Sequence, residues 1–456
     1  MELDMTKGKP SSLILKFIWP VLLGNVFQQL YNMVDTIIVG RCVGFDALAA
    51  VGATGTILFL ILGFAMGLTT GFTVITSQKF GAGDHEAVKI SAVNSLLLSV
   101  FVVIILTFAS VAGMPTLLRW MHTPEDIFGM SLDYITIICY GLGFTVLYNI
   151  LASLLRAVGN SKTPLYFLVI SAVLNIVLDL VLIRNFGMGV KGAALATIIS
   201  QAVSGILCFI YILFKVPVLV PDFKKIKIDT YMMGIQLKIG IPMALQYSIT
   251  AVGTIIVQAA LNLLGSVAVA SYTAANKVST LVTLPYSAFG VTMATYSAQN
   301  RGVNDIDRIQ KGNSVANHMS FVYSILIFAV AMPLLPVMLK LFVDSSSGVD
   351  FDTVLGYART YMIISGINFT PLGVIFILRN TLQGCGFSLV AMFGGVVELV
   401  SRVIIAFIAS SKMSFAGVCA ADGLTWLITG IYFFIVYMYK LKQMRRDKME
   451  FENKNA

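Results

Sequence analysis

The feature that most constrains this chain is a series of long apolar runs that recur from residue 13 to residue 440. Each run is roughly 20 to 30 residues long, the length that a helix needs to cross the hydrocarbon core of a bilayer. None of the runs alternates apolar and polar residues with the period of two that a half-buried strand shows. Because backbone polar groups in lipid must be paired within the segment, the runs predict membrane-spanning helices.

Composition supports lipid as the solvent for most of the chain. Of the 456 residues, 57% are hydrophobic and 12% are charged, about half the charged fraction of an ordinary soluble domain. The predicted fold class is therefore an all-α integral membrane protein with twelve transmembrane helices. The first six helices are placed at 13–40, 46–77, 88–113, 127–155, 163–184 and 190–214, and the second six at 232–264, 267–298, 310–341, 353–380, 387–410 and 413–440.

The two halves of the chain resemble each other. The segment KFIWP (16–20) matches KIGIP (238–242), SQKFGAGD (77–84) matches SAQNRGVND (297–305), and LLRAVGNSKTP (154–164) matches ILRNTLQGCGF (377–387). The offset stays within 221–223 residues, which predicts two six-helix lobes related by a pseudo-twofold axis along the membrane normal. The predicted organisation is an N-lobe (1–214), a cytoplasmic linker (215–231), a C-lobe (232–441) and a basic tail (442–456).

The basic residues are distributed unevenly between the two sides of the predicted bundle. Of the 31 Lys and Arg residues, 22 fall on the side that carries both termini, and Lys277 and Arg402 fall inside spans. The positive-inside rule then predicts a cell-membrane protein with both termini in the cytoplasm. The net charge of +9 indicates contact with anionic membrane lipids rather than with nucleic acid.

No motif of a soluble enzyme or an ATPase is present. The chain lacks GxxxxGK[ST], HExxH and GxSxG, and its GMGVKG (187–192) follows no strand and lies in a predicted outer loop. The five cysteines are scattered, which favours buried thiols over disulfides or a metal site. We therefore expect a protein that is no enzyme, takes no cofactor, and is driven by an ion gradient.

Polar residues inside the predicted membrane region point to a site in the first half. Asp35, Asn175, Asp179 and Thr197 fall in three different spans, with Asn149 in a fourth. Asp35, Asp179 and Thr197 share one level, roughly 7–10 Å inside the outer boundary at about 1.5 Å per residue. Two carboxylates with hydroxyl and amide neighbours can bind a cation such as Na⁺ or share a proton. A purely structural hydrogen-bonding role stays open for each acid.

The second half carries a different cluster at matching positions. Glu398 and Arg402 correspond to Asn175 and Asp179, and Asp422 corresponds to Thr197. One arginine between two acids indicates a neutral or singly negative cluster, either a structural ion network or a substrate or gating site.

Two prolines lie deep within spans at equivalent positions. Pro20 and Pro242 predict helix kinks, and the alternative is a packing defect that neighbouring helices tolerate.

Together these residues resemble the multidrug and toxin extrusion (MATE) family, in its bacterial type with a cation site in the amino-terminal lobe. The resemblance covers about residues 12–440 and rests on the Pro20-to-Asp35 spacing, the Asn175-x-x-x-Asp179 pair, and the Gln78-x-x-Gly81 and Gln299-x-x-Gly302 turns. It implies a monomeric antiporter that exports amphipathic, mostly cationic compounds in exchange for H⁺ or Na⁺ by alternating access. It also implies a cation site at Asp35, Asn175, Asp179 and Thr197, joined by Asn149.

The sequence departs from one subgroup of that family and leaves other functions open. Where the subgroup has an acid early in span 7, this chain has Gln246, Tyr247 and Thr250, which argues against a cation site there. A lipid-linked oligosaccharide flippase of the same superfamily is the main alternative, but intramembrane acids outnumber bases here. A channel, a membrane enzyme, or an importer of the same fold are further alternatives. The choice of coupling ion and the range of substrates do not follow from the sequence.

Overall fold

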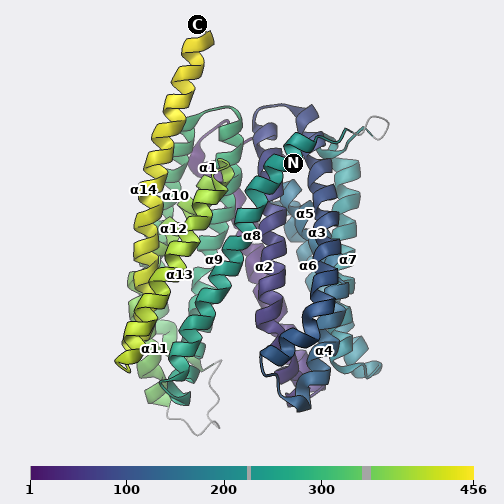
Figure 1. Ribbon diagram of the computed structural model, residues 1–456, viewed down its shortest axis with the longest axis vertical. Helices are drawn as coiled ribbons and strands as arrows, with labels where there is room; N and C mark the ends of the chain where they lie inside the picture. The colour runs from purple at the N-terminus through teal and green to yellow at the C-terminus, as the bar shows by residue number, and fades with distance from the viewer. Residues whose placement is uncertain (1, 223–226, 341–350, 456) are drawn as a thin grey trace. The chain divides into compact units, whose positions relative to one another are not determined.

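The computed structural model describes residues 2–222, 227–340 and 351–455, and every regular element in these ranges is a helix (Figure 1). The first half contains α1 (Pro10–Cys42), α2 (Phe45–Gly81), α3 (His85–Trp120), α4 (Glu125–Tyr140), α5 (Leu142–Ala157), α6 (Lys162–Asp179), the π-helical turn η1 (Leu180–Asn185), α7 (Gly189–Lys215) and the 3₁₀ turn η2 (Pro217–Leu219). The second half contains α8 (Thr230–Asn262), α9 (Ser266–Gly302), α10 (Ile306–Leu339), α11 (Phe351–Ile367), α12 (Phe369–Gly384), α13 (Ser388–Ser411) and α14 (Phe415–Asn455).

Nine helical segments within the described residues are long and apolar enough to cross a membrane, or eleven when each of two bent helix pairs counts as one span. The pairs are α4 with α5, bent by 47°, and α11 with α12, bent by 48°. Each pair occupies one predicted span. Helix α9 fills the remaining predicted position, although its composition is too polar to pass the same test. The chain is thus a multi-pass membrane protein.

The chain forms two compact units, and two helices each contribute residues to both units. Unit 1 comprises residues 1–5 and 19–247, and unit 2 comprises residues 6–18 and 248–456. Helices α1 and α8 each begin in one unit and end in the other. Pro20 and Pro242 lie inside these helices, within a few residues of the points where the chain changes unit. Their role as kinks stays a prediction.

The first half of α8 belongs to unit 1 and packs closely there through small residues and one buried amide. A Cβ atom built on Gly67 of α2 would lie 2.6 Å from the Cα atom of Ala244, so only glycine permits this backbone approach. One turn away, Gly71 meets Gly240 at even closer range. The Nε2 group of Gln236 donates to the carbonyl of Phe72 at 3.1 Å and, across on α3, to the carbonyl of Ser91 at 3.0 Å.

The internal repeat is visible in how corresponding helices begin. The Asp84 side chain caps α3 by accepting from the Ala87 N–H at 3.1 Å, and Asp305 caps α10 by accepting from the Arg308 N–H at 2.9 Å. Gly44 and Gly265 precede α2 and α9 with positive φ angles of 127° and 91°, a conformation that glycine adopts without strain. The two units therefore share a local folding plan.

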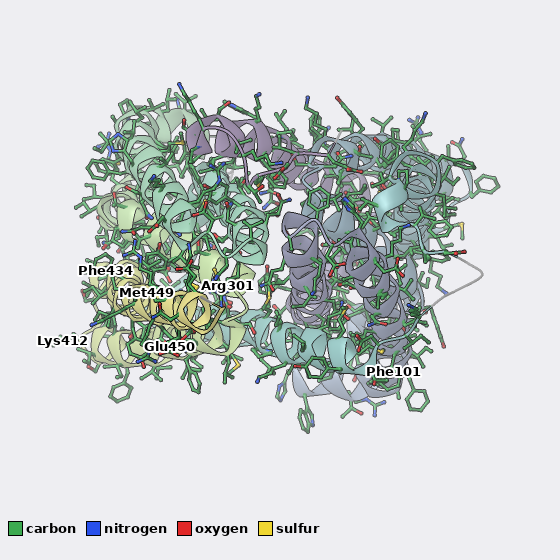
Figure 2. The ribbon with its side chains drawn as sticks, turned by 90° about the horizontal axis from the view of Figure 1, so that it is seen from above. Phe101, Arg301, Lys412, Phe434, Met449 and Glu450 are labelled. Carbon is green, nitrogen blue, oxygen red and sulfur yellow. The ribbon has the colours of Figure 1, made fainter. Side chains whose placement is uncertain are left out.

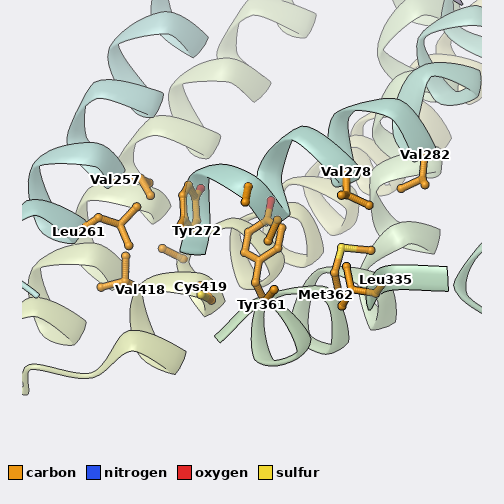
Figure 3. Close-up of a cluster of buried hydrophobic side chains, with 14 of the residues drawn as sticks. Val257, Leu261, Tyr272, Val278, Val282, Leu335, Tyr361, Met362, Val418 and Cys419 are labelled. Atoms are coloured by element: carbon orange, nitrogen blue, oxygen red, sulfur yellow. The ribbon is translucent and has the colours of Figure 1, made fainter. Parts of the chain in front are cut away.

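Large apolar side chains are exposed around both units. Phe101 on α3 is 63% exposed and Phe434 on α14 is 57% exposed, and each lies at the periphery in Figure 2. Such contiguous apolar surfaces are unstable in water but stable against acyl chains. Inside unit 2, a core of buried hydrophobic side chains includes Tyr272, Tyr361 and Met362 (Figure 3).

Candidate ion sites in the two units

In unit 1 the structure brings together the two acids that the sequence singles out. Asp35 lies on α1 and Asp179 is the last residue of α6, and their carboxyl groups lie within hydrogen-bonding reach of each other. The Asp179 side chain is fully buried. Ionised carboxylates have acceptors only, so this pair holds together only with a proton or a cation between its oxygens.

Asn175 and an irregular helical turn flank Asp179 along the chain. Asn175 is fully buried one turn before Asp179 on α6. Directly after Asp179, the backbone continues as the π-helical turn Leu180–Asn185. Such turns concentrate at functional sites because the extra residue changes the direction in which side chains point. The sequence of this turn, LVLIRN, contains no pattern that predicts a π-helical turn.

Two tyrosines that the sequence analysis missed lie near the acids. The hydroxyl groups of Tyr31 and Thr197 are hydrogen-bonded, and Tyr31 interacts electrostatically with both acids. The buried Tyr134 on α4 also interacts electrostatically with both acids. The signal for Tyr31 was available, because it precedes Asp35 by four residues and so lies on the same helix face. Tyr134 falls in an ordinary amphipathic helix with no distinguishing pattern.

Asn149 takes a different partner in this structure. Its amide donates to the Thr145 carbonyl, 2.9 Å away and one turn earlier on α5. Its membership of the cation site therefore stays a prediction.

The donor set around Asp35 and Asp179 is made of oxygens from carboxyl, hydroxyl and amide groups. Hard monovalent cations and protons suit such donors, whereas zinc and copper prefer nitrogen and sulfur. Among the residues that the structure describes, no group of three or more His, Cys, Asp or Glu side chains is arranged to hold a metal ion.

In unit 2 the structure assembles the predicted charge cluster around Arg402. Its Nη2 atom donates to Glu398 Oε1 at 3.1 Å, and its Nε atom lies 3.3 Å from Asp422 Oδ1. The hydroxyl of Tyr272 donates to the other oxygen of Asp422 at 2.8 Å. All three charged side chains are buried, so the guanidinium is a fixed cation between two acids.

Glycine at position 253 makes room for this guanidinium. A Cβ atom at Gly253 on α8 would lie 2.7 Å from Arg402 Nη1. Any larger residue at this position would therefore push the guanidinium away from its two acids.

Comparison with known proteins places the chain among multidrug transporters. The family model described as MatE matches residues 20–181 and 242–408. The chain is similar to the probable multidrug resistance protein YoeA of Bacillus subtilis, with 29% identity over 96% of this chain and 97% of that protein. It is also similar to the probable multidrug resistance protein YpnP of the same organism, with 27% identity over 96% of each chain.

Solved structures share the fold. A crystal structure of a MATE protein in complex with MaL6 superposes with a TM-score of 0.90 at 22% identity, and covers 97% of this chain and 99% of that one. At this level of identity the likeness concerns the fold, and it agrees with two lobes of six helices.

Proposed function

The chain belongs to the MATE family of transporters, and from that premise we propose that it is a secondary-active multidrug efflux antiporter. It exports amphipathic, mostly cationic compounds in exchange for H⁺ or Na⁺. The observation that carries the proposal is the close approach of the carboxyl groups of Asp35 and Asp179 in unit 1.

The pair supports exchange because the two acids come from different helices. The proton or cation that joins their oxygens links α1 to α6, and its release leaves two like charges in contact in a low-dielectric interior. That repulsion favours a second arrangement of α1 relative to α6. An ion that binds one arrangement better than the other shifts the population between them by its differential affinity.

Export follows if the compound and the ion prefer opposite arrangements. The reciprocity of linked binding then requires each ligand to weaken the affinity of the other. Pro20 lies on α1 directly after residue 19, where the chain enters unit 1 again, and before Asp35 on the same helix. A proline removes one backbone hydrogen bond and so lets the helix bend at that level.

In unit 2, the cluster of Glu398, Arg402 and Asp422 supports a different role. A guanidinium stays protonated at every physiological pH, so Arg402 is no exchangeable coupling ion. We assign the cluster to gating or to substrate contact, and we expect the protein to work as a monomer in the cell membrane, in contact with its lipids and with both termini in the cytoplasm.

Transport by purified protein in proteoliposomes tests this function. A planar fluorescent cation is loaded, and either a pH gradient or a Na⁺ gradient is imposed alone. We expect one gradient to drive uphill movement of the dye and Asp35→Asn to abolish it. Equal dye movement with and without both gradients would refute antiport, and the gradient that works identifies the coupling ion.

A further inference from the structure

Helix α9 exposes one stripe of side chains, and among its described residues no large hydrophobic side chain is exposed. The exposed positions follow helical spacing and are Ser266, Ala270, Thr273, Asn276, Lys277 and Thr280. Residues three and four apart lie on one helix face. The exposed face of this helix is therefore small, polar and positively charged.

The corresponding helix of unit 1 has a different surface. Helix α2 starts 221 residues earlier and has the same length, yet it exposes Phe59, Leu60 and Met66. Unlike α9, it is apolar enough to be a candidate span. A lipid-facing surface is apolar, whereas polar intramembrane residues face water or protein. The stripe on α9 is therefore unsuited to face lipid.

Lys277 is the charged residue of this stripe. It lies 11 residues after the first residue of α9, which places it about 16 Å along a helix that crosses a core of about 30 Å. The side chain is too short to reach either interface from that depth. An ammonium facing lipid at a helix centre is strongly unfavourable, so Lys277 requires water or an anion beside it.

The nearby acids of unit 2 are already engaged. Asp422 is held by Tyr272 and Arg402, and Glu398 is held by Arg402. Within the described part of the chain, no ion pair involves Lys277. Its positive charge is therefore available to a ligand.

Asn276 adds donors next to this charge. The hydroxyl of Tyr361 donates to Asn276 Oδ1 at 3.1 Å, which leaves the two hydrogens of Nδ2 for an external acceptor. Tyr361 is 1% exposed and packs edge-on against Tyr272 with ring centroids 4.9 Å apart; both rings lie in the core (Figure 3). The tyrosine therefore fixes which edge of the amide faces outward.

The hydroxyl groups of the two threonines that flank this pair can accept a hydrogen bond from a ligand but have no hydrogen left to donate. Thr273 donates its hydroxyl hydrogen to the Val269 carbonyl, and Thr280 donates its own to the Asn276 carbonyl, each at 2.8 Å. The donors that remain between these two threonines belong to Lys277 and Asn276.

We propose that Asn276 and Lys277 bind the anionic group, a carboxylate or a sulfonate, of a transported compound. The ammonium supplies the charge, and the oriented amide supplies a second hydrogen bond. This inference rests on the proposed export function and deepens it, because it names the residues that contact the acidic group of a transported zwitterionic compound.

A matched pair of dyes tests the inference: a zwitterionic xanthene with a free carboxylate and its methyl ester. Binding to purified protein is measured by fluorescence anisotropy, and transport is measured in proteoliposomes. Lys277→Gln should weaken binding of the acid by about tenfold, the size of one charge-assisted hydrogen bond, and should leave binding of the ester unchanged. Lys277→Arg should restore most of the affinity for the acid.

Lys412→Gln, an exposed lysine at the end of α13, is the matched control and should affect neither dye. The inference is overturned if wild-type protein binds the acid no more tightly than the ester. It is also overturned if Lys277→Gln weakens both dyes equally, or if it leaves the acid unaffected. Binding of the acid that depends on Lys277, without gradient-driven transport of either dye, would refute the export function and retain the anion site.

Discussion

The carboxyl group of Asp35 on α1 lies within hydrogen-bonding reach of that of Asp179 on α6. The two helices are far apart in the chain and meet inside one compact unit. Because two ionised carboxylates repel at this range, the contact reports whether a proton or a cation is bound between them. A proton or cation bound at this pair would thus act directly on the packing of two helices.

Asp35→Asn and Asp179→Asn should each abolish coupled efflux and leave the fold intact. The amide has the same shape and still hydrogen-bonds, but it neither releases a proton nor binds a cation by charge. The coupling free energy between ion and compound, typically ~1–3 kcal/mol, should vanish. Gradient-driven dye transport in proteoliposomes measures this, with Asp46→Asn, an exposed acid at the start of α2, as the control. Near-normal antiport by either variant would remove that acid from the coupling site.

Tyr31→Phe should weaken binding of the coupling ion without abolishing transport. The substitution removes the hydroxyl that is hydrogen-bonded to Thr197 near both acids, and one such neutral hydrogen bond is worth about 0.5–1.5 kcal/mol. The ion concentration for half-maximal transport should therefore rise by about threefold to tenfold, with an unchanged maximal rate. A lower maximal rate with unchanged ion dependence would instead show that Tyr31 acts on the conformational step.

Much of the architecture could be predicted from apolar run lengths, since lipid leaves a long helix few alternatives. The breaks at Gly141 between α4 and α5 and at Asn368 between α11 and α12 were missed, because a bend changes packing without interrupting the apolar pattern. Helix α9 was predicted to be an ordinary span, and its lack of exposed apolar side chains became apparent only with the structure.

The candidate site could likewise be predicted only in part. Intramembrane acids are rare enough to stand out in a sequence, which is why Asp35 and Asp179 could be predicted as partners. The position of Tyr134 near these acids could not be predicted. A tyrosine is common in amphipathic helices, and only tertiary packing brings this one near Asp35 and Asp179. The π-helical turn after Asp179 depends on packing as well.

Gly67→Ala should destabilise unit 1, whereas Gly52→Ala on the same helix should not. A Cβ atom at Gly67 would lie 2.6 Å from the Ala244 backbone, while one at Gly52 would meet no atom within 4 Å. Separating the two backbones should cost ~1–3 kcal/mol, as overpacking does elsewhere. Thermal unfolding of both variants in detergent measures the difference. Equal unfolding temperatures would show that α2 and α8 do not approach as closely as described.

The last prediction concerns Arg402 and Glu398, which are paired at 3.1 Å with both side chains buried. Removing one partner of a buried pair leaves an uncompensated charge and typically costs ~3–5 kcal/mol, whereas removing both is far milder. Arg402→Ala leaves Glu398 and Asp422 facing each other without their shared cation. It should therefore reduce expression, thermal stability or transport more than the double change Arg402→Ala/Glu398→Gln does.

A double-mutant cycle in thermal stability and dye efflux measures this coupling, with Glu398→Gln alone completing the cycle. Recovery in the double variant would show that the arginine serves mainly to neutralise its acids. Defects that add without any interaction would show that the two side chains act independently. If stability recovers but efflux stays low, the guanidinium itself contacts the compound or the moving helix. Normal efflux by all three variants would confine function to unit 1 and the stripe on α9.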